Sequence, residues 1–249
     1  MILRIPRRNN LISVLMAMNY LTSKGGYQFI LTNDGFICPV VTEDEAMNVI
    51  FKSFSMFTDG IDGIIKINIP DLEAFKKFLK NVPAKDVDLS YDEHLNSVYF
   101  DEQKLSLNGK AVIPGLVKPK TELNGPFYLV EIKNPGALSE MCTCKDLGEK
   151  VEINNRFILL FNWKSNVEVT DEKGETVGNF FNIFLDRKMI LNVTKVHKKM
   201  DSGSMYIKIF KDSSIPLVKI TGDAKSYTVY CGKCAEEGVK DNGTAAERI

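Results

Sequence analysis

Two pairs of closely spaced cysteines are the residues of this sequence that come nearest to a metal site. Cys142 and Cys144 are separated by one residue and Cys231 and Cys234 by two, so together they could supply the four thiolates of a structural zinc site. Cys142 and Cys144, however, fall on a predicted helix, where residues two positions apart point roughly 200° away from each other around the axis. Because that geometry is poor for binding one ion, we favour unpaired structural cysteines over a zinc site.

Other residue types used in catalysis are scarce or scattered. His94 and His197 are the two histidines, and neither is spaced from the other or from a carboxylate as metal ligands are. We expect His197, which two lysines follow, to lie at the surface. The sequence contains neither a glycine-rich phosphate loop nor a Gly-x-Ser-x-Gly elbow. We therefore expect no catalytic residues, no cofactor and a protein that is not an enzyme.

Basic residues are concentrated on or beside predicted helices, and binding of phosphate groups is the chemistry that they favour. The net charge is +4 over residues 1–33, +2 over residues 71–85 and +4 over residues 185–200, whereas the whole chain is neutral, with 32 basic and 32 acidic residues. Helices that turned these residues to one surface would attract a nucleic-acid backbone without distinguishing the bases. The alternative for any single helix is that its lysines merely keep an exposed face in water.

These helices belong to a pattern of elements that occurs in both halves of the chain. In the first half, apolar spacing and capping residues predict a helix from Asn9 or Asn10 to about Leu21 and another from Pro70, in its first turn, to about Lys80. Strands are expected at 27–31, 36–41, 47–57, 63–69, 86–91, 96–101 and 104–108, with a tight hairpin at Asn33-Asp34-Gly35.

The second half follows the same order. A helix is expected from Asn134, its N-cap, to about Leu147, and another begins after the capping residue Asp186. Strands are expected at 127–133, 151–154, 156–162, 165–170, 176–185, 205–210, 216–221 and 226–231, with a hairpin turn at 171–174. Two helices and many short strands in each half predict two similar α+β domains, a repeat of pattern rather than of letters.

The domain boundaries follow from this pattern. We expect domains at 1–109 and 127–234, an extended linker rich in proline and glycine at 110–126, and a polar, disordered tail at 235–249. The composition, 44% hydrophobic and 26% charged, is that of a globular protein. Since the chain has no run of 18 apolar residues, no apolar signal segment at 1–10 and an odd number of cysteines, five, we expect an intracellular protein with no membrane partner.

Several stretches of the second half resemble the sliding clamps of the eukaryotic, archaeal and viral replication systems. They are Phe127–Lys133 with the following helix, the helix ending Cys144-Lys145-Asp146-Leu147, the strand start Ile215-Pro216-Leu217-Val218, and Tyr227–Lys233 followed by Glu236-Glu237. The resemblance covers nearly the whole length, but residues 231–233 are Cys-Gly-Lys where the family has Ala-Pro-Lys. The chain thus resembles a divergent clamp, such as those of phages and other viruses. This implies antiparallel sheets backing two inner helices per domain.

The resemblance implies a DNA polymerase sliding clamp, a processivity factor that encircles duplex DNA as a homotrimeric ring. Its partners would be DNA polymerase, a clamp loader and other clamp-binding peptides, in the cytoplasm or, for a phage, the host cytoplasm; tailed-phage clamps also serve late transcription. The phosphate contacts implied on the inner helices are Lys76, Lys77, Lys80, Lys145, Arg187, Lys188 and Lys195, with Arg7, Arg8 and Lys24 beside the first helix.

Family members bind partner peptides in a hydrophobic pocket beneath the linker. The matching positions in this sequence are Val112, Ile113 and Leu116 of the linker, with Pro216 and either Val229 or Tyr230. The alternative for the last three residues is ordinary strand packing.

Two other functions stay open from sequence. A viral structural or assembly protein built from duplicated β-rich domains would share the strand count and neutrality, and would form a large lattice instead of a trimer. A hydrolase or nuclease with a scattered site would reveal itself by metal-dependent cleavage of DNA.

Overall fold

The computed structural model describes residues 1–21, 26–42, 47–54, 56–58, 63–108, 125–144, 148–160, 163–178, 181–211 and 217–232. These residues form four helices and eighteen strands, and the strands pair antiparallel in three sheets. The expected α+β class, with helices backed by antiparallel sheets, is confirmed.

The largest sheet runs through both halves of the chain. In order across the sheet its nine strands are β14 (Glu168–Asp171), β10 (Phe127–Ile132), β16 (Met205–Phe210), β17 (Leu217–Gly222), β18 (Tyr227–Gly232), β4 (Met47–Ser53), β3 (Gly35–Val41), β2 (Tyr27–Thr32) and β6 (Ile65–Ile69). The halves meet where β18 pairs with β4, from Tyr227 opposite Phe51 to Cys231 opposite Met47. Backbone hydrogen bonds therefore join the two halves into one unit.

Each half also has a smaller sheet of its own. The five-stranded sheet of the first half contains, in order, β5 (Phe57–Thr58), β1 (Ile2–Ile5), β7 (Val87–Asp92), β8 (Ser97–Phe100) and β9 (Gln103–Ser106). The four-stranded sheet of the second half contains β13 (Trp163–Asn166), β12 (Phe157–Leu160), β11 (Lys150–Asn154) and β15 (Asn182–Asp186). β9 and β13 are edge strands of these two sheets.

The helices are α1 (Arg8–Met18), α2 (Leu72–Asn81), α3 (Pro135–Thr143) and α4 (Arg187–Met200). The predicted N-caps Asn134 and Asp186 are confirmed, because their side-chain oxygens accept hydrogen bonds from Ala137 N and Met189 N.

Two other predictions about helix starts were wrong. Pro70 precedes α2 instead of lying in its first turn, and Asp71 caps the helix by accepting a hydrogen bond from Ala74 N. Asn9 and Asn10 lie inside α1, which begins after Arg7 without a side-chain cap.

Two strand predictions also need correction. The expected strand 176–185 is not continuous, since Thr176 makes an isolated bridge to Thr170 and β15 begins only at Asn182. β1, which precedes α1 as β10 precedes α3, had no prediction from sequence. The hairpin at Asn33-Asp34-Gly35 is confirmed by the pairing of Thr32 with Gly35, although Gly35 alone has the positive φ, 138°.

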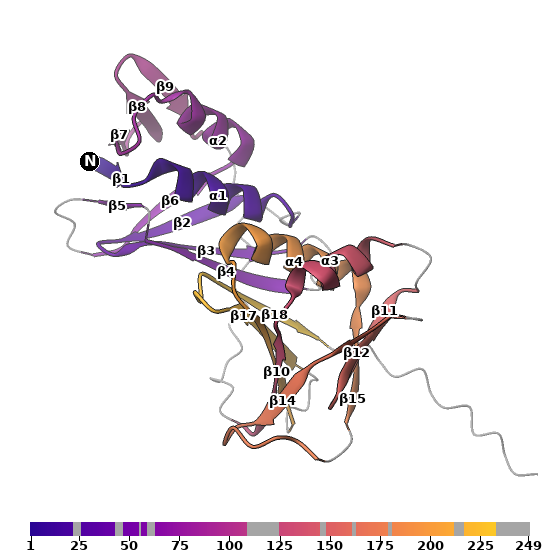
Figure 1. Cartoon of the computed structure of the whole chain (residues 1–249). Coiled ribbons are helices and arrows are strands. Elements are labelled where there is room, and N and C mark those ends of the chain that lie inside the picture. Colours follow the sequence, from indigo (N-terminus) through magenta and orange to yellow (C-terminus); the bar gives the residue numbers. More distant parts are fainter. Residues whose placement is uncertain are drawn as a thin grey trace, which may run out of the picture.

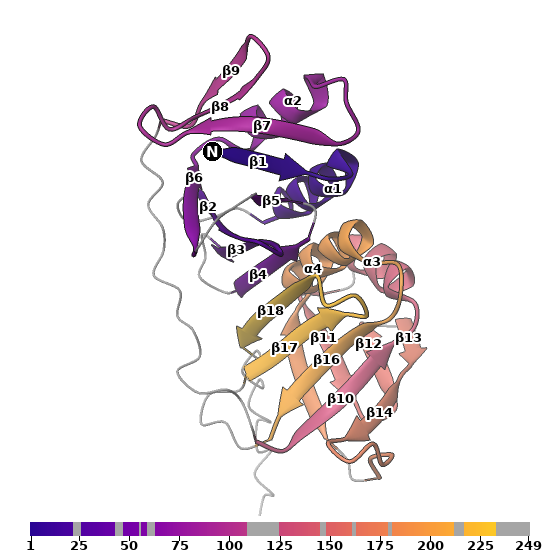
Figure 2. The same cartoon turned by 90° about the vertical axis from the view of Figure 1, so that its left-hand side faces the viewer.

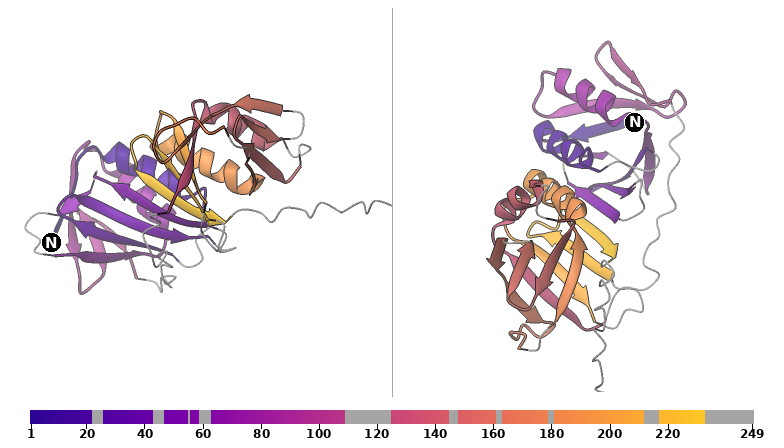
Figure 3. Two further views of the ribbon diagram at one scale, coloured as in Figure 1. Left: turned by 90° about the horizontal axis from the view of Figure 1, so that it is seen from below. Right: turned by 90° about the vertical axis from the view of Figure 1, so that its right-hand side faces the viewer.

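All four helices lie together on one side of the molecule, with the sheets behind them (Figures 1 and 2). They form a row in the order α2, α1, α4, α3, in which each helix contacts the next, and the right-hand view of Figure 3 shows the same row. One apolar cluster fills the space between helices and sheets, from Leu3 and Leu15 in the first half to Val193 and Ile220 in the second. Within the described residues, no helix has the length and apolarity of a membrane span.

Candidate nucleic-acid interface

The α4 helix presents a stripe of lysines away from the core. Lys188, Lys195 and Lys199 are spaced by seven and four residues, which places them on one face of the helix. The opposite face, which includes Ile190 and Val193, is buried. Lys188 is exposed and the other two are half-buried, and the Lys195 ammonium lies 6.0 Å from the centre of the Tyr20 ring, beyond the end of α1. Among the described residues none of the three has a carboxylate partner.

Lys198 and Lys199 were not among the residues chosen from sequence. Lys198 is exposed and Lys199 half-buried in the last turn of α4. The signal that could have found Lys199 is the helical spacing from Lys188 and Lys195. Since cations in a last turn also interact favourably with the helix dipole, both lysines stabilise α4 in addition to making its surface basic.

The α2 helix supplies the other basic part of the row. Lys77 and Lys80 are exposed, while the Lys76 side chain is 13% exposed and its ammonium forms an ion pair with Glu73. The three lysines surround a shallow hollow on the helix surface of about 340 Å³, which Asp71 and Glu73 also line. Lys77 and Lys80 are therefore free to contact a phosphate, whereas Lys76 would have to leave its carboxylate.

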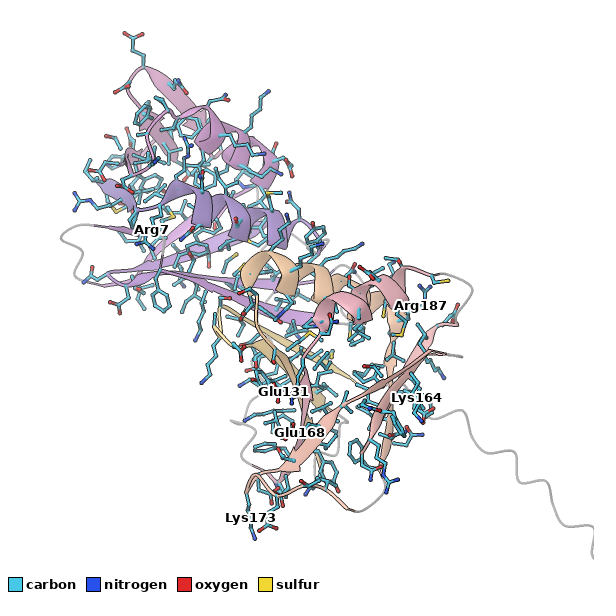
Figure 4. The ribbon with its side chains drawn as sticks, in the orientation of Figure 1. Arg7, Glu131, Lys164, Glu168, Lys173 and Arg187 are labelled. Carbon is cyan, nitrogen blue, oxygen red and sulfur yellow. The ribbon has the colours of Figure 1, made fainter. Side chains whose placement is uncertain are left out.

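The three arginines on or beside the row differ in how their side chains are held. Arg187 donates from Nη1 to the carbonyl of Cys142 at 2.7 Å, which ties α4 to α3. Arg8 is half-buried, and its Nε and Nη1 are enclosed without a hydrogen-bond partner. Arg7 is exposed, and its backbone N–H donates to Asp86. Arg7, just before α1, and Arg187, at the start of α4, lie on opposite sides of the view in Figure 4. Lys24 and Lys145 lie outside the described residues.

The positions matched to a partner pocket separate into two groups. Val112, Ile113, Leu116 and Pro216 lie outside the described residues. Val229 is fully buried against the core, so its side chain is not accessible to a partner, whereas Tyr230 points to the other face of β18 and is half-buried. Of the two alternatives offered by sequence, Tyr230 is thus the residue that a partner could touch.

The candidate metal ligands do not gather. Cys142 is buried on α3, Cys144 is exposed at the C-cap of that helix, Cys231 is buried on β18, and Cys234 lies outside the described residues. Over the ranges that the structure describes, no group of three or more His, Cys, Asp or Glu side chains could hold a metal ion.

His197 corrects the expectation of a surface residue, because it is only 3% exposed. Its Nε2 lies 2.9 Å from the carbonyl of Gly203, and Nδ1 lies 2.8 Å from the hydroxyl of Tyr227. A cleft of about 410 Å³ between the first turn of α3 and the last turn of α4 reaches this ring. Both ring nitrogens are occupied within the protein, so His197 has none left to act on a substrate.

The edge strands of the two small sheets carry unpaired backbone groups. In β9, Gln103 pairs with Phe100, and the Leu107 N–H donates to the Asn96 carbonyl. Because residues bonded to the neighbouring strand alternate along an antiparallel strand, the N–H and C=O groups of Lys104 and Ser106 point outward from the sheet. In β13, Trp163 pairs with Leu160, and the Val167 N–H donates to the Arg156 carbonyl. By the same alternation, the N–H and C=O groups of Lys164 and Asn166 point outward from that sheet. β9 and β13 therefore can each accept another strand.

Comparison with known proteins bears on the fold. No protein-family model matches the sequence, and no curated protein matches it. A crystal structure of the PCNA2–PCNA3 complex from Sulfolobus tokodaii matches with a TM-score of 0.63 at 14% identity, covering 95% of this chain and 100% of that one. The chain has the sliding-clamp fold. The DNA polymerase sliding clamp from Bacillus subtilis matches with a TM-score of 0.61 at 12% identity, covering 95% of this chain and 65% of that one.

At identities of 14% and 12%, these matches show the fold alone, so the activity of this chain has to be argued from its own residues. The sliding-clamp fold was expected from the resemblance in the second half, and it is confirmed for nearly the whole chain.

Proposed function

We propose that this chain is one subunit of a DNA sliding clamp, a ring that encircles duplex DNA and tethers a DNA polymerase and other proteins to it. The observation that carries the proposal is the helical row, which gathers Lys77, Lys80, Lys188, Lys195 and Lys199 on one side of a neutral chain. The structural matches add that proteins of this fold include one named as a DNA polymerase sliding clamp.

The proposed DNA contacts suit sliding because they are few and mobile. Lysine ammonium groups attract phosphates through counterion release, and this attraction does not depend on the base sequence. The polar residues of α1 that face outward, such as Asn9 and Ser13, have no charge to add to this attraction. Duplex DNA would thus be held weakly and uniformly, and contacts to phosphates could be exchanged as the ring moves.

Closure of the ring is proposed through the edge strands β9 and β13. In Figure 2, β9 lies at the top of the first half and β13 at the right-hand side of the second half, so pairing the β9 edge of one subunit with the β13 edge of the next gives a head-to-tail interface. Interfaces of this kind form rings when the rotation closes, and closure pairs the β9 and β13 edges of every subunit. With two domains in each chain, we propose a homotrimer of six domains.

Partners are proposed to bind on the outside of the ring, beside Tyr230 and the residues of the linker. They would include a DNA polymerase, a clamp loader that opens the ring, and other peptides that compete for the same surface. For a phage clamp in its host cytoplasm, a component of late transcription would be a further partner. The protein itself performs no chemistry in this account.

Light scattering tests the assembly directly. We expect a particle of three times 28.0 kDa, about 84 kDa, at micromolar concentration. A monomer at all concentrations, or a large lattice of the kind expected for a viral assembly protein, would contradict the proposal. Incubation with a plasmid and Mg²⁺ should leave the DNA intact, whereas cleavage would favour a nuclease.

A further inference from the structure

Two lysines lie directly opposite each other on the nine-stranded sheet. Lys208 on β16 pairs with Lys219 on β17, and Lys219 in turn lies opposite Tyr230 on β18, which lies opposite Asn48 on β4. All four side chains point away from the buried face that Ile207, Ile209, Val218 and Val229 form. We call these four residues, on the sheet face away from the core, the outer lysine row. Like charges directly opposite on neighbouring strands destabilise a sheet.

No acidic side chain of the described residues forms an ion pair with either lysine. The pKa of Lys208 lies below its ordinary value because burial and the ammonium groups of Lys219 and Lys225 disfavour its charged form. Two carboxylates on or beside the neighbouring strands already accept hydrogen bonds: Glu131 from the Ser204 hydroxyl at 2.7 Å and Asp223 from Ser204 N at 2.8 Å. Across the part of the chain that the structure describes, the positive charge of this pair is therefore not neutralised.

The rings beside the lysines and the amide of Asn48 define what an anion bound to this pair should look like. The Lys208 ammonium lies 4.2 Å from the centre of the Phe127 ring, and the Lys219 ammonium lies 5.9 Å from the centre of the Tyr230 ring. Because cations already sit over both rings, these faces are not free to stack with bases. The Asn48 Oδ1 atom is buried and has no hydrogen-bond donor among the described residues. Within the described residues, the row thus lacks carboxylate acceptors for its ammonium groups.

We propose that the outer lysine row is a docking surface for an acidic peptide segment of a clamp-binding partner. Carboxylates of the segment would neutralise Lys208 and Lys219 without needing to stack on the Phe127 or Tyr230 rings, whose faces these lysines already cover. The proposal rests on the proposed function, since it specifies the chemistry of the partner that binds beside Tyr230.

A pair of labelled peptides tests this directly. Fluorescence anisotropy would compare a fluorescein-labelled peptide of six glutamates with its six-glutamine counterpart and with a twelve-residue oligothymidylate, at low salt. We expect the glutamate peptide to bind at least tenfold more tightly than the glutamine peptide. The Lys208→Gln/Lys219→Gln protein should lose that preference. Lys66→Gln, which removes one exposed lysine from β6 of the same sheet, is the control for position on the sheet and should keep it.

Each other outcome overturns the proposal. Equal loss of binding in Lys66→Gln would mean that charge alone is responsible, and tighter binding of the oligothymidylate through the same two lysines would make the occupant a nucleic acid. Equal binding of the glutamate and glutamine peptides would also overturn the proposal. A second variant guards against misfolding: Lys219→Glu should raise the Tm, by pairing with Lys208, while abolishing peptide binding. Trimer formation should be unchanged in all variants, so failure of the docking surface is distinguishable from failure of the ring.

Discussion

The Nδ1 atom of His197 and the hydroxyl of Tyr227 lie 2.8 Å apart inside the second half of the chain. Because the carbonyl of Gly203 can only accept, Nε2 of the neutral ring carries the proton and donates to it, and Nδ1 then accepts from the Tyr227 hydroxyl. These bonds tie the last turn of α4 to β18, the strand through which the second half pairs with the first. The buried histidine therefore holds the helical row in place.

Replacement of either partner should destabilise the fold. Tyr227→Phe leaves the buried Nδ1 without a donor, and we expect a loss of about 1–3 kcal/mol in the free energy of unfolding, with a similar or larger loss for His197→Leu. Urea unfolding followed by circular dichroism measures both. His94→Ala, in an exposed turn, is the control and should change stability by less than about 0.5 kcal/mol. Unchanged stability of Tyr227→Phe would refute the bond.

The two cysteines near the end of α3 should differ in reactivity with pH. Burial raises the pKa of the Cys142 thiol to about 11, against the opposing effect of the Arg187 guanidinium, whereas Cys144 is exposed. A raised thiol pKa means less thiolate at neutral pH, so alkylation of Cys142 by iodoacetamide should be slow at pH 8 and rise about tenfold per pH unit until pH nears 11. Mass spectrometry of the adducts measures this; labelling of Cys142 as fast as Cys144 at pH 8 would be inconsistent with it.

The α4 stripe should determine how DNA affinity responds to salt. We expect Lys188→Gln/Lys195→Gln/Lys199→Gln to weaken binding of duplex DNA and to lower the slope of log affinity against log salt by roughly 0.9 for each phosphate that the variant no longer neutralises. A control with the same charge change, Lys52→Gln/Lys66→Gln/Lys173→Gln, removes exposed lysines that lie away from the helices. The account would fail here if both triple variants reduced the slope equally.

A proline in β9 should prevent assembly without unfolding the subunit. The Lys104 N–H points outward from the edge, so Lys104→Pro removes a bond to the next subunit and none within its own sheet. We expect this variant to be monomeric by light scattering, at nearly unchanged Tm. Lys104→Gln keeps the N–H and should remain trimeric. Trimers of the proline variant would show that β9 is not at the interface.

Elements determined by local sequence were predictable. Asp186 and the apolar spacing from Met189 to Val196 define α4 without reference to the rest of the chain, and Asn134 does the same for the start of α3. The sliding-clamp resemblance was found in the same second half. It led to the correct fold because β10, β17 and β18 hold the motifs that carry it.

Elements that depend on contacts between distant parts of the chain could not be predicted from the sequence. β1 has only four residues and is stabilised by pairing with β7, more than eighty residues away. The start of α1 is fixed by the Asp86 carboxylate, which accepts a hydrogen bond from the Arg7 backbone N–H. His197 was misplaced because the two lysines after it outweighed its spacing from Ile190 and Val193, which puts it on the buried face. Arg187 was chosen for its charge, but its bond to Cys142 depends on how α3 and α4 pack.

Retention on circular and linear DNA is the measurement that tests the ring most directly. The protein is loaded onto a nicked plasmid, the sample is divided, one part is cut once with a restriction enzyme, and protein still bound is measured after gel filtration at moderate salt. We predict that the protein stays on the intact circles and leaves the cut molecules, because only an encircling ring needs an end to leave. Equal loss from both templates would contradict the account.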